Sequence, residues 1–151
     1  MKTFDLIKQY KFFEKDIKRR VLKVLSSGSY ILGQNVKSFE NNARNYLATR
    51  YTVSCNSGTD ALVMSLRALN IGNNDQVITT PFTYFATSEA ISLVGATPIF
   101  ADINPHTYNI NPKKIEKLIS KKTKAILSVN LFGQACDCLL YTSDAADEGL
   151  G

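Results

Sequence analysis

Apolar residues recur at helical spacing through the first third of the chain. Five of them lie on one face of the segment Phe12–Leu25, namely Phe13, Ile17, Val21, Val24 and Leu25. This spacing predicts an amphipathic helix with that face buried. A glycine-bracketed loop, Ser26–Gly33, separates it from a second predicted helix, Val36–Ala48. The side chains expected to face inward from the second helix are Phe39, Ala43, Tyr46 and Leu47.

From residue 52 onward, short apolar stretches alternate with amphipathic ones. The apolar stretches predict strands at Thr52–Cys55, Gln76–Thr80, Thr97–Asp102 and Lys124–Phe132. Helices are predicted between them at Asp60–Leu69, Thr87–Val94 and 111–120, the last with Asn111 as N-cap and Pro112 in the first turn. The final strand is nearly all apolar, which is typical of burial on both faces of a sheet. The alternation predicts an α/β layered fold with a mostly parallel sheet.

The last fourteen residues, Cys138–Gly151, abandon this alternation and carry three acidic and no basic residues. The stretch resembles translated sequencing-adapter read-through, so we expect a non-native tail at 138–151. A genuine carboxyl terminus is the alternative. Residues 1–137 are then expected to form part of one domain, in keeping with the usual size of about 100–200 residues.

Charge and composition exclude several classes of protein. Eighteen Lys and Arg against thirteen Asp and Glu give a formal charge of +5. The basic clusters Lys15–Arg20 and Lys113–Lys124 are interrupted by apolar positions at helical spacing, which favours solvated helix faces over a nucleic-acid surface. No apolar run approaches the ~20 residues of a membrane span, and residues 1–16 lack the apolar core of a signal peptide. We therefore expect a cytoplasmic protein that binds neither nucleic acid nor membrane.

The cysteines and the single histidine offer little chemistry. Three cysteines, an odd number, argue against a disulfide framework, and no zinc-ligand spacing is present. Cys55 ends a predicted strand, where a small buried side chain is the ordinary role. His106 lies in the turn-like stretch Asn-Pro-His-Thr-Tyr-Asn and is expected on the surface. A Cys–His hydrolase is therefore disfavoured.

Two consecutive strand-to-helix junctions carry the candidate chemistry. At Ser57–Thr59 a helix N-terminus, a glycine and two hydroxyls together suit a phosphate, although Ser and Thr also cap helices without a ligand. The next loop holds Phe82, Tyr84 and Phe85, and loops of neighbouring parallel strands meet at one edge of a sheet. A planar phosphorylated cofactor would need such a pair of features. The alternative is a proline-led turn with two of the three rings in the core.

Five stretches occur here in the order and spacing of a known family. They are SGSYILG, SCNSGTDAL, VITTPFTYFATSEAI, PIFADINPHTYNINP and TKAILSVNLFGQACD. Together they are similar to the DegT/StrS-type sugar aminotransferases over about residues 1–137. The resemblance implies pyridoxal 5'-phosphate as cofactor. It also implies the three-layer, mostly parallel α/β large domain of the aspartate-aminotransferase fold (fold-type I), truncated in this chain.

The resemblance also assigns roles to individual residues. Cofactor contacts are expected at Ser57, Gly58, Thr59 and Tyr84. Gly58 and Thr59 would hold the phosphate through backbone N–H groups and the Thr59 hydroxyl, and Tyr84 would stack on the pyridine ring. Residues expected to line the substrate site are Tyr30, Ile31, Gly133 and Gln134. Phe85 is expected in the core, and Asp102 is as well suited to capping the next turn as to contacting substrate.

The activity implied by the resemblance is transfer of an amine, with glutamate as donor, to a nucleotide-linked keto-sugar for surface polysaccharides. A homodimer is expected for the full-length protein. The family's covalent lysine and the aspartate at the pyridine nitrogen match no position here, so the chain as given is expected to be inactive. Two alternatives stay open: a sugar dehydratase of the same family that lacks the lysine, and a non-catalytic α/β module that binds a nucleotide or phosphate.

Overall fold

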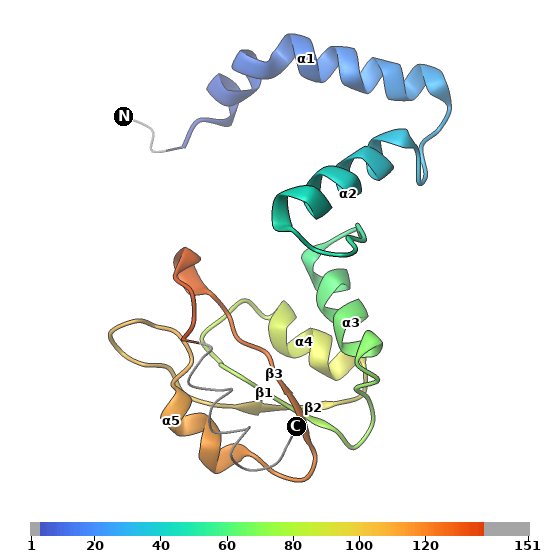
Figure 1. The fold of residues 1–151 in the computed structure, drawn as a ribbon. Helices are drawn as coiled ribbons and strands as arrows, with labels where there is room; N and C mark the ends of the chain where they lie inside the picture. The colour runs from blue at the N-terminus through green and yellow to red at the C-terminus, as the bar shows by residue number, and fades with distance from the viewer. Residues whose placement is uncertain (1–3, 138–151) are drawn as a thin grey trace. The chain divides into compact units, whose positions relative to one another are not determined.

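The structure is a computed structural model and describes residues 4–137. The chain divides into two compact units, Met1–Ser54 and Cys55–Gly151, which are described separately (Figure 1). The tail predicted to be non-native, 138–151, lies outside the described residues.

The first unit consists of the two predicted helices, α1 (Leu6–Ser27) and α2 (Gln34–Leu47). Helix α1 begins earlier than predicted because Asp5 caps it, accepting a 3.0 Å hydrogen bond from the Lys8 N–H. It ends at Gly28, whose φ of 65° is left-handed. Capping by a short acidic side chain and termination by a left-handed glycine are common helix boundaries.

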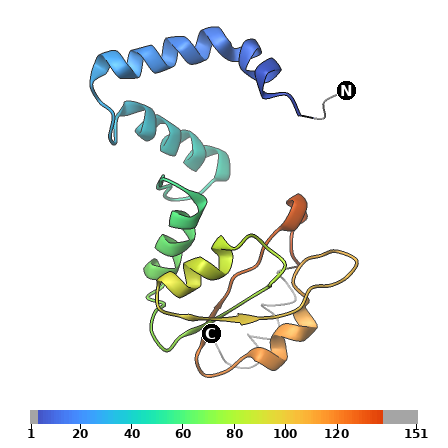
Figure 2. The same ribbon diagram turned by 180° about the vertical axis from the view of Figure 1, so that it is seen from behind.

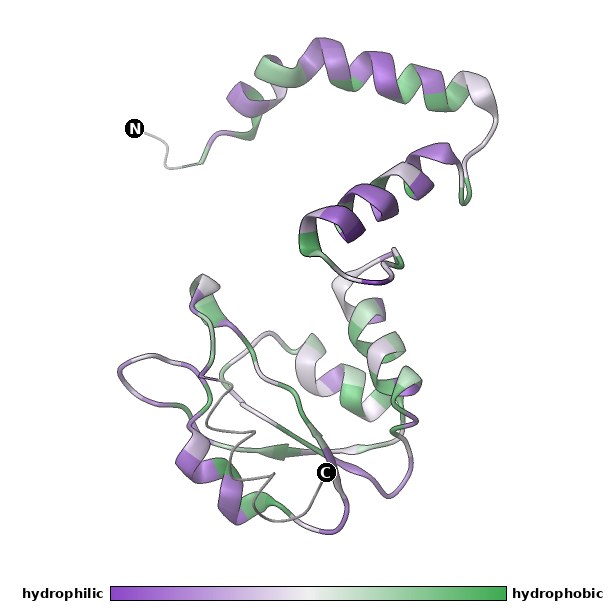
Figure 3. Ribbon diagram, viewed as in Figure 1, coloured by the Kyte–Doolittle hydropathy of each residue, from purple (hydrophilic) through white to green (hydrophobic). Residues whose placement is uncertain are grey.

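The expected burial of the apolar helix faces is wrong for this chain. Neither α1 nor α2 contains a buried residue. The apolar positions of α1 alternate with polar ones along the helix (Figure 3). Large side chains predicted to face inward are exposed, among them Phe13, Ile17, Val21, Leu25, Phe39, Tyr46 and Leu47. The helical spacing is real, but no described segment of this unit covers the faces that it creates.

The predicted strand Thr52–Cys55 is also wrong, since these residues form no strand. A strand needs a neighbour for its backbone groups, and the Ser54 N–H instead donates to Glu40 Oε1 at 2.9 Å. The Ser54 hydroxyl donates to the same oxygen at 2.8 Å. Cys55 is exposed rather than buried.

The second unit contains a parallel three-stranded sheet in the order β2-β1-β3. The strands are β1 (Gln76–Thr79), β2 (Thr97–Phe100) and β3 (Thr123–Ile126). Gln76 pairs with Thr97 on one side and with Thr123 on the other, so β1 is central. The parallel arrangement confirms the prediction. Strand β3 stops at Ile126, and the chain then turns into the short 3-10 helix η2 (Leu131–Gly133), so the predicted strand to Phe132 is too long.

Helices cover both faces of this sheet. Helices α3 (Gly58–Ala68) and α4 (Ala86–Leu93) lie on one face (Figures 1 and 2). Helix α5 (Pro112–Ile115), continued by the 3-10 helix η1 (Glu116–Leu118), lies on the other. Asn111 caps α5 as predicted, accepting from the Lys113 N–H at 3.1 Å. Three layers result, as expected for the fold class.

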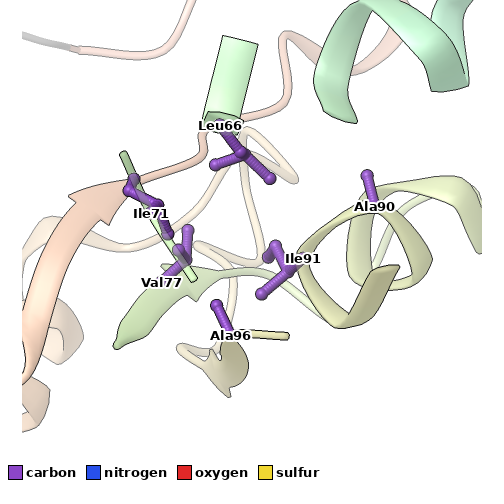
Figure 4. Close-up of a cluster of buried hydrophobic side chains, with 6 residues drawn as sticks. All are labelled: Leu66, Ile71, Val77, Ala90, Ile91 and Ala96. Carbon is purple, nitrogen blue, oxygen red and sulfur yellow. The ribbon is translucent and has the colours of Figure 1, made fainter. Parts of the chain in front are cut away.

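The core has two halves that meet at β1. Val77 belongs to one cluster and Ile78 to the other, because successive strand residues point to opposite faces. The first cluster comprises Leu66, Ile71, Val77, Ala90, Ile91 and Ala96 (Figure 4). The second comprises Ile78, Ala101, Ile110, Ile115 and Cys136. Strand β3 is only half-buried, contrary to expectation, because it lies at an edge of the described sheet. Within residues 4–137, no helix combines the length and apolarity needed to cross a bilayer.

Candidate active site

The first part of the site is the N-terminus of α3. Ser57 is the N-cap, with extended backbone (φ −152°, ψ 166°). Its Oγ accepts from the Asp60 N–H at 3.1 Å and donates to Asp60 Oδ2 at 3.0 Å. Ser57 therefore caps the helix, which is one of the two roles that the sequence left open. Its hydroxyl is used in hydrogen bonds to Asp60.

The next two residues differ from Ser57 because their backbone donors are available. The Ala61 N–H is the first to bond back along the helix, to Ser57 O at 3.0 Å, so those of Gly58 and Thr59 have no acceptor within the described chain. A Cβ placed on Gly58 would meet no heavy atom within 4 Å. Two N–H groups without an acceptor in the described chain thus lie at the positive end of an 11-residue helix. This arrangement can hold an oxyanion.

The second part of the site is the loop from β1 to α4. Tyr84 is 82% exposed, so most of its side chain is open to contact with a ligand. The loop is braced by threonines: the Thr80 hydroxyl accepts from the Phe82 N–H at 3.2 Å, and the Thr83 and Thr87 hydroxyls lie 3.0 Å apart. A polar, ordered support under an exposed ring is suited to presenting that ring to a flat ligand.

The predicted burial of rings in this loop is wrong. Phe85 is 71% exposed, and Phe82 is 46% exposed, so neither lies in the core. The last buried residues before the loop are Thr79 and Thr80. The Thr79 hydroxyl donates to Leu127 O at 2.8 Å, which links the last residue of β1 to the residue that follows β3. After Thr80 the chain leaves the sheet, and the described residues leave the side chains of Phe82 and Phe85 exposed there.

The third part of the site is the loop after β3. Phe132 and Gly133 both adopt positive φ, 53° and 81°, and the chain turns sharply there. Gln134 follows, with an exposed side chain and a backbone oxygen that accepts from Asn109 Nδ2 at 3.2 Å. Gly133 and Gln134 therefore lie beyond the end of β3 at Ile126, at the end of η2 and just after it, rather than at the strand end that the sequence predicted.

The topology brings these three parts to one side of the second unit. Strands β1 and β3 are parallel, so their following loops leave from the same edge of the sheet. Helix α3 runs toward the amino end of β1, so its own N-terminus points toward the carboxyl edge (Figure 1). The N-terminus of α3 and the loops that follow β1 and β3 therefore lie toward that edge of the second unit (Figure 1).

Tyr30 and Ile31 belong to the first unit. Tyr30 is 65% exposed, and its hydroxyl donates to Leu25 O at 3.0 Å. Ile31 is 87% exposed. Their expected role in lining a substrate site stays a prediction.

Three other polar groups have local roles. The Asp102 carboxylate accepts from the Ile103 N–H at 2.8 Å, which fits capping of the turn, one of the two roles considered for it. His106 is exposed in a turn, as predicted, and its backbone N–H donates to Asn104 Oδ1 at 2.9 Å. The hydrogen bonds from the Ser54 N–H and hydroxyl lower the pKa of Glu40, because they stabilise its charged form.

Sequence reasoning missed Asn109. It is 5% exposed, and its Nδ2 donates to Gln134 O at 3.2 Å and to Ala135 O at 3.0 Å. These acceptors lie 25 and 26 residues further along the chain, so no local pattern could reveal the contact.

Comparison with known proteins identifies the chain's relatives. The profile of the DegT/DnrJ/EryC1/StrS aminotransferase family matches residues 12–150. The UDP-2-acetamido-2-deoxy-3-oxo-D-glucuronate aminotransferase of Pseudomonas aeruginosa is 42% identical over 146 residues, which are 97% of this chain and 41% of that protein.

Solved structures agree in fold. A DegT DnrJ EryC1 StrS aminotransferase from Brucella abortus matches with a TM-score of 0.89 and 37% identity, over 99% of this chain and 42% of that one. The NtdA protein of Bacillus subtilis, solved with the bound cofactor PMP, gives 0.85 and 36% over 89% of this chain and 31% of that one. The chain spans about two fifths of the length of the first two relatives. These likenesses confirm the predicted fold class, and the chain belongs to the DegT/DnrJ/EryC1/StrS aminotransferase family.

Proposed function

We propose that this chain is the amino-terminal part of a pyridoxal 5'-phosphate-dependent aminotransferase that acts on a nucleotide-linked keto-sugar. Its family membership supports the reaction class. The name of the Pseudomonas aeruginosa relative supports the substrate class, since that name specifies a UDP-linked 3-oxo sugar. The chain spans 41% of that relative, so we assign the catalytic lysine to a part of the full-length protein outside this chain.

One observation carries the cofactor assignment: Gly58 and Thr59, whose N–H groups have no acceptor among the described residues, begin a helix that points toward the sheet edge from which the loop with the exposed Tyr84 leaves. A phosphate needs such donors, and a pyridine ring needs a flat surface against which to stack. The residues present therefore fit both ends of pyridoxal 5'-phosphate. When bound, this cofactor supplies the electron sink for amine transfer.

The residues of this chain bind and orient the cofactor. Gly58 and Thr59 donate backbone N–H groups to the phosphate, and the Thr59 hydroxyl adds a further donor. Ser57 acts less directly, because its hydroxyl holds the first turn of α3 in the conformation that aims those donors. Tyr84 positions the ring.

Substitution of Gly58 by proline tests this proposal. Proline lacks the N–H but suits the first position of a helix. Ser57 before it is already extended, as a residue preceding proline must be, and the space beside Gly58 is open. The chain itself uses this arrangement at Asn111-Pro112, where α5 begins.

The full-length protein carrying Gly58→Pro should keep its thermal stability but bind pyridoxal 5'-phosphate about tenfold or more weakly, the effect of losing one hydrogen bond to a charged group. Gly58→Ala retains the N–H and serves as the matched control, with affinity close to that of the wild type. Wild-type affinity in the proline variant would refute the phosphate site.

The reaction is tested separately on the full-length protein. With glutamate as donor and a UDP-linked 3-oxo sugar as acceptor, we expect an amino-sugar product by mass spectrometry. A product that has lost water instead would identify the dehydratase alternative. The absence of both products from a panel of nucleotide-linked keto-sugars would count against the proposed substrate class.

We also propose that the full-length protein is a homodimer. The apolar face of α1 supports association, since Phe13, Ile17, Val21 and Leu25 are 41–55% exposed. Light scattering coupled to size exclusion should give twice the mass of one full-length chain. A single-chain mass at micromolar concentration would overturn this assignment.

A further inference from the structure

The loop that joins β2 to α5 is closed on itself by its own backbone. This β2–α5 loop, residues 101–111, carries an antiparallel bridge between Ile103 and Ile110. Inside the bridge, the Asn104 N–H donates to Asn109 O, and the Tyr108 N–H donates to Asn104 O, both at 2.8 Å. The loop is therefore a compact element with a defined shape, and it offers two side chains to its neighbours.

On one side, the Asn109 side chain is hydrogen-bonded to the loop after β3. Its Nδ2 donates to the backbone oxygens of Gln134 and Ala135, and its Oδ1 is buried without a partner in the described structure. The reversed amide orientation would place Oδ1 against two carbonyl oxygens, none of which can donate. The two acceptors thus dictate the orientation of the buried amide, at the cost of an unsatisfied oxygen.

On the other side, Tyr108 touches the loop after β1. Its ring lies 5.9 Å from that of Phe82, centroid to centroid, with the planes inclined by 32°. Phe82 is two residues before Tyr84, whose ring we assign to the cofactor. Tyr108 itself has a φ of 59°, which is unfavourable for a residue with a side chain. Surrounding contacts must hold it in that conformation.

The sheet order shows what these contacts achieve. Strand β1 is central, with β2 and β3 on opposite sides of it. The β2–α5 loop therefore reaches from one edge of the sheet, past the carboxyl end of β1, to the loop that follows β3. It touches both of the loops to which the site residues Tyr84, Gly133 and Gln134 belong.

We propose that the β2–α5 loop is a positioning element that fixes these two loops relative to each other, with Asn109 as its main positioning residue. Asn109 reaches the site only through the backbone that it holds. The loop connection stands on the contacts alone, whereas its consequence for the cofactor rests on the proposed function.

Amide hydrogen exchange on the cofactor-free, full-length protein tests the connection directly. Asn109→Leu keeps the approximate shape of the side chain and removes both donors. Protection of residues 131–136 should fall about tenfold or more, the effect expected for two hydrogen bonds. Asn104→Ala is the matched control, because within residues 4–137 the Asn104 side chain bonds only to the His106 N–H in its own loop. It should leave residues 131–136 unchanged.

A second variant, Tyr108→Gly, covers failure of the first to fold. Glycine accepts a φ of 59° without strain, so the loop backbone is retained while the ring contact is lost. Exchange at residues 82–84 should then rise severalfold. Unchanged exchange in both variants would overturn the proposal.

Cofactor binding provides the functional readout. In Asn109→Leu we expect weaker binding of pyridoxal 5'-phosphate and a reduced circular dichroism signal from the bound chromophore, neither of which Asn104→Ala should show. Faster exchange with unaltered cofactor affinity would overturn the positioning role. If the wild type binds no cofactor, the proposed function fails, while the exchange experiment still decides whether the loops are connected.

Discussion

Gly133→Ala isolates the cost of one backbone conformation in the candidate site. Gly133 has a φ of 81°, and a Cβ there would meet nothing within 4 Å, so no steric collision adds to the effect. The left-handed conformation costs a residue with a side chain about 1–2 kcal/mol. Loss of freedom in the unfolded chain returns about 0.4–1 kcal/mol. We therefore expect the free energy of unfolding to fall by about 1 kcal/mol.

The same chain supplies the control. Gly58 also has open space around its Cβ position, but its φ is not positive, so an added side chain there meets neither a collision nor left-handed strain. Gly58→Ala should be neutral or stabilise the unit by up to about 1 kcal/mol, because alanine is the better helix former.

Native-state hydrogen exchange of the β1 amides in the full-length protein measures both variants, since these buried amides report opening of the whole unit. Equal stabilities for Gly133→Ala and Gly58→Ala would refute the reasoning. That result would mean that the turn after β3 adopts another conformation in solution.

Three further predictions concern the cap, a carboxylate and the exposed ring. Ser57→Ala should destabilise α3 by about 1 kcal/mol through loss of the cap, measured by exchange of the α3 amides. The lowered pKa of Glu40 means that its hydrogen bonds to Ser54 stabilise the fold above its ordinary pKa of 4.5 and are lost as the pH falls through the lower folded value. Urea midpoints should therefore drop further in that acidic range for the wild type than for Glu40→Gln, in which Glu14 still titrates with a lowered pKa; parallel curves would exclude the effect. Phe85→Ser should change the free energy of unfolding by no more than about 0.5 kcal/mol, whereas Ile78→Ala, at a fully buried position, should cost about 2–5 kcal/mol. A large loss in Phe85→Ser would mean that the ring is buried after all.

Much of the fold follows from local sequence because its elements rest on local contacts. The cap of α5 was predictable because Asn111 bonds to the N–H of Lys113, two residues away. The central strand was predictable because Val77 and Ile78 are apolar and each faces a covered side of the sheet. Such elements are predictable because the contacts that produce them lie within a few residues of each other.

The failures share the opposite property. Thr52–Cys55 has the composition of a strand, yet pairing depends on a neighbour that is far away in the sequence, and here a carboxylate of α2 takes the donor of Ser54. Phe85 is a large apolar residue of the kind found in cores, but its burial would require other residues to cover the loop after β1. The spacing of apolar residues records which side chains are suited to burial. It does not record what covers them.

The candidate site divides along the same line. The proposed phosphate end could be located from the sequence, because Ser57, Gly58 and Thr59 are consecutive and one helix N-terminus organises all three. The contact that holds the loop after β3 could not be predicted, because Asn109 and its acceptor Gln134 O are 25 residues apart in the sequence. Asn109 and Asn111 are the same residue type, two positions apart, and only the distance to the partner separates the predicted role from the missed one. In this chain, candidate groups that lie within one turn of backbone can be found by sequence, whereas groups that hold one loop against another require the folded structure.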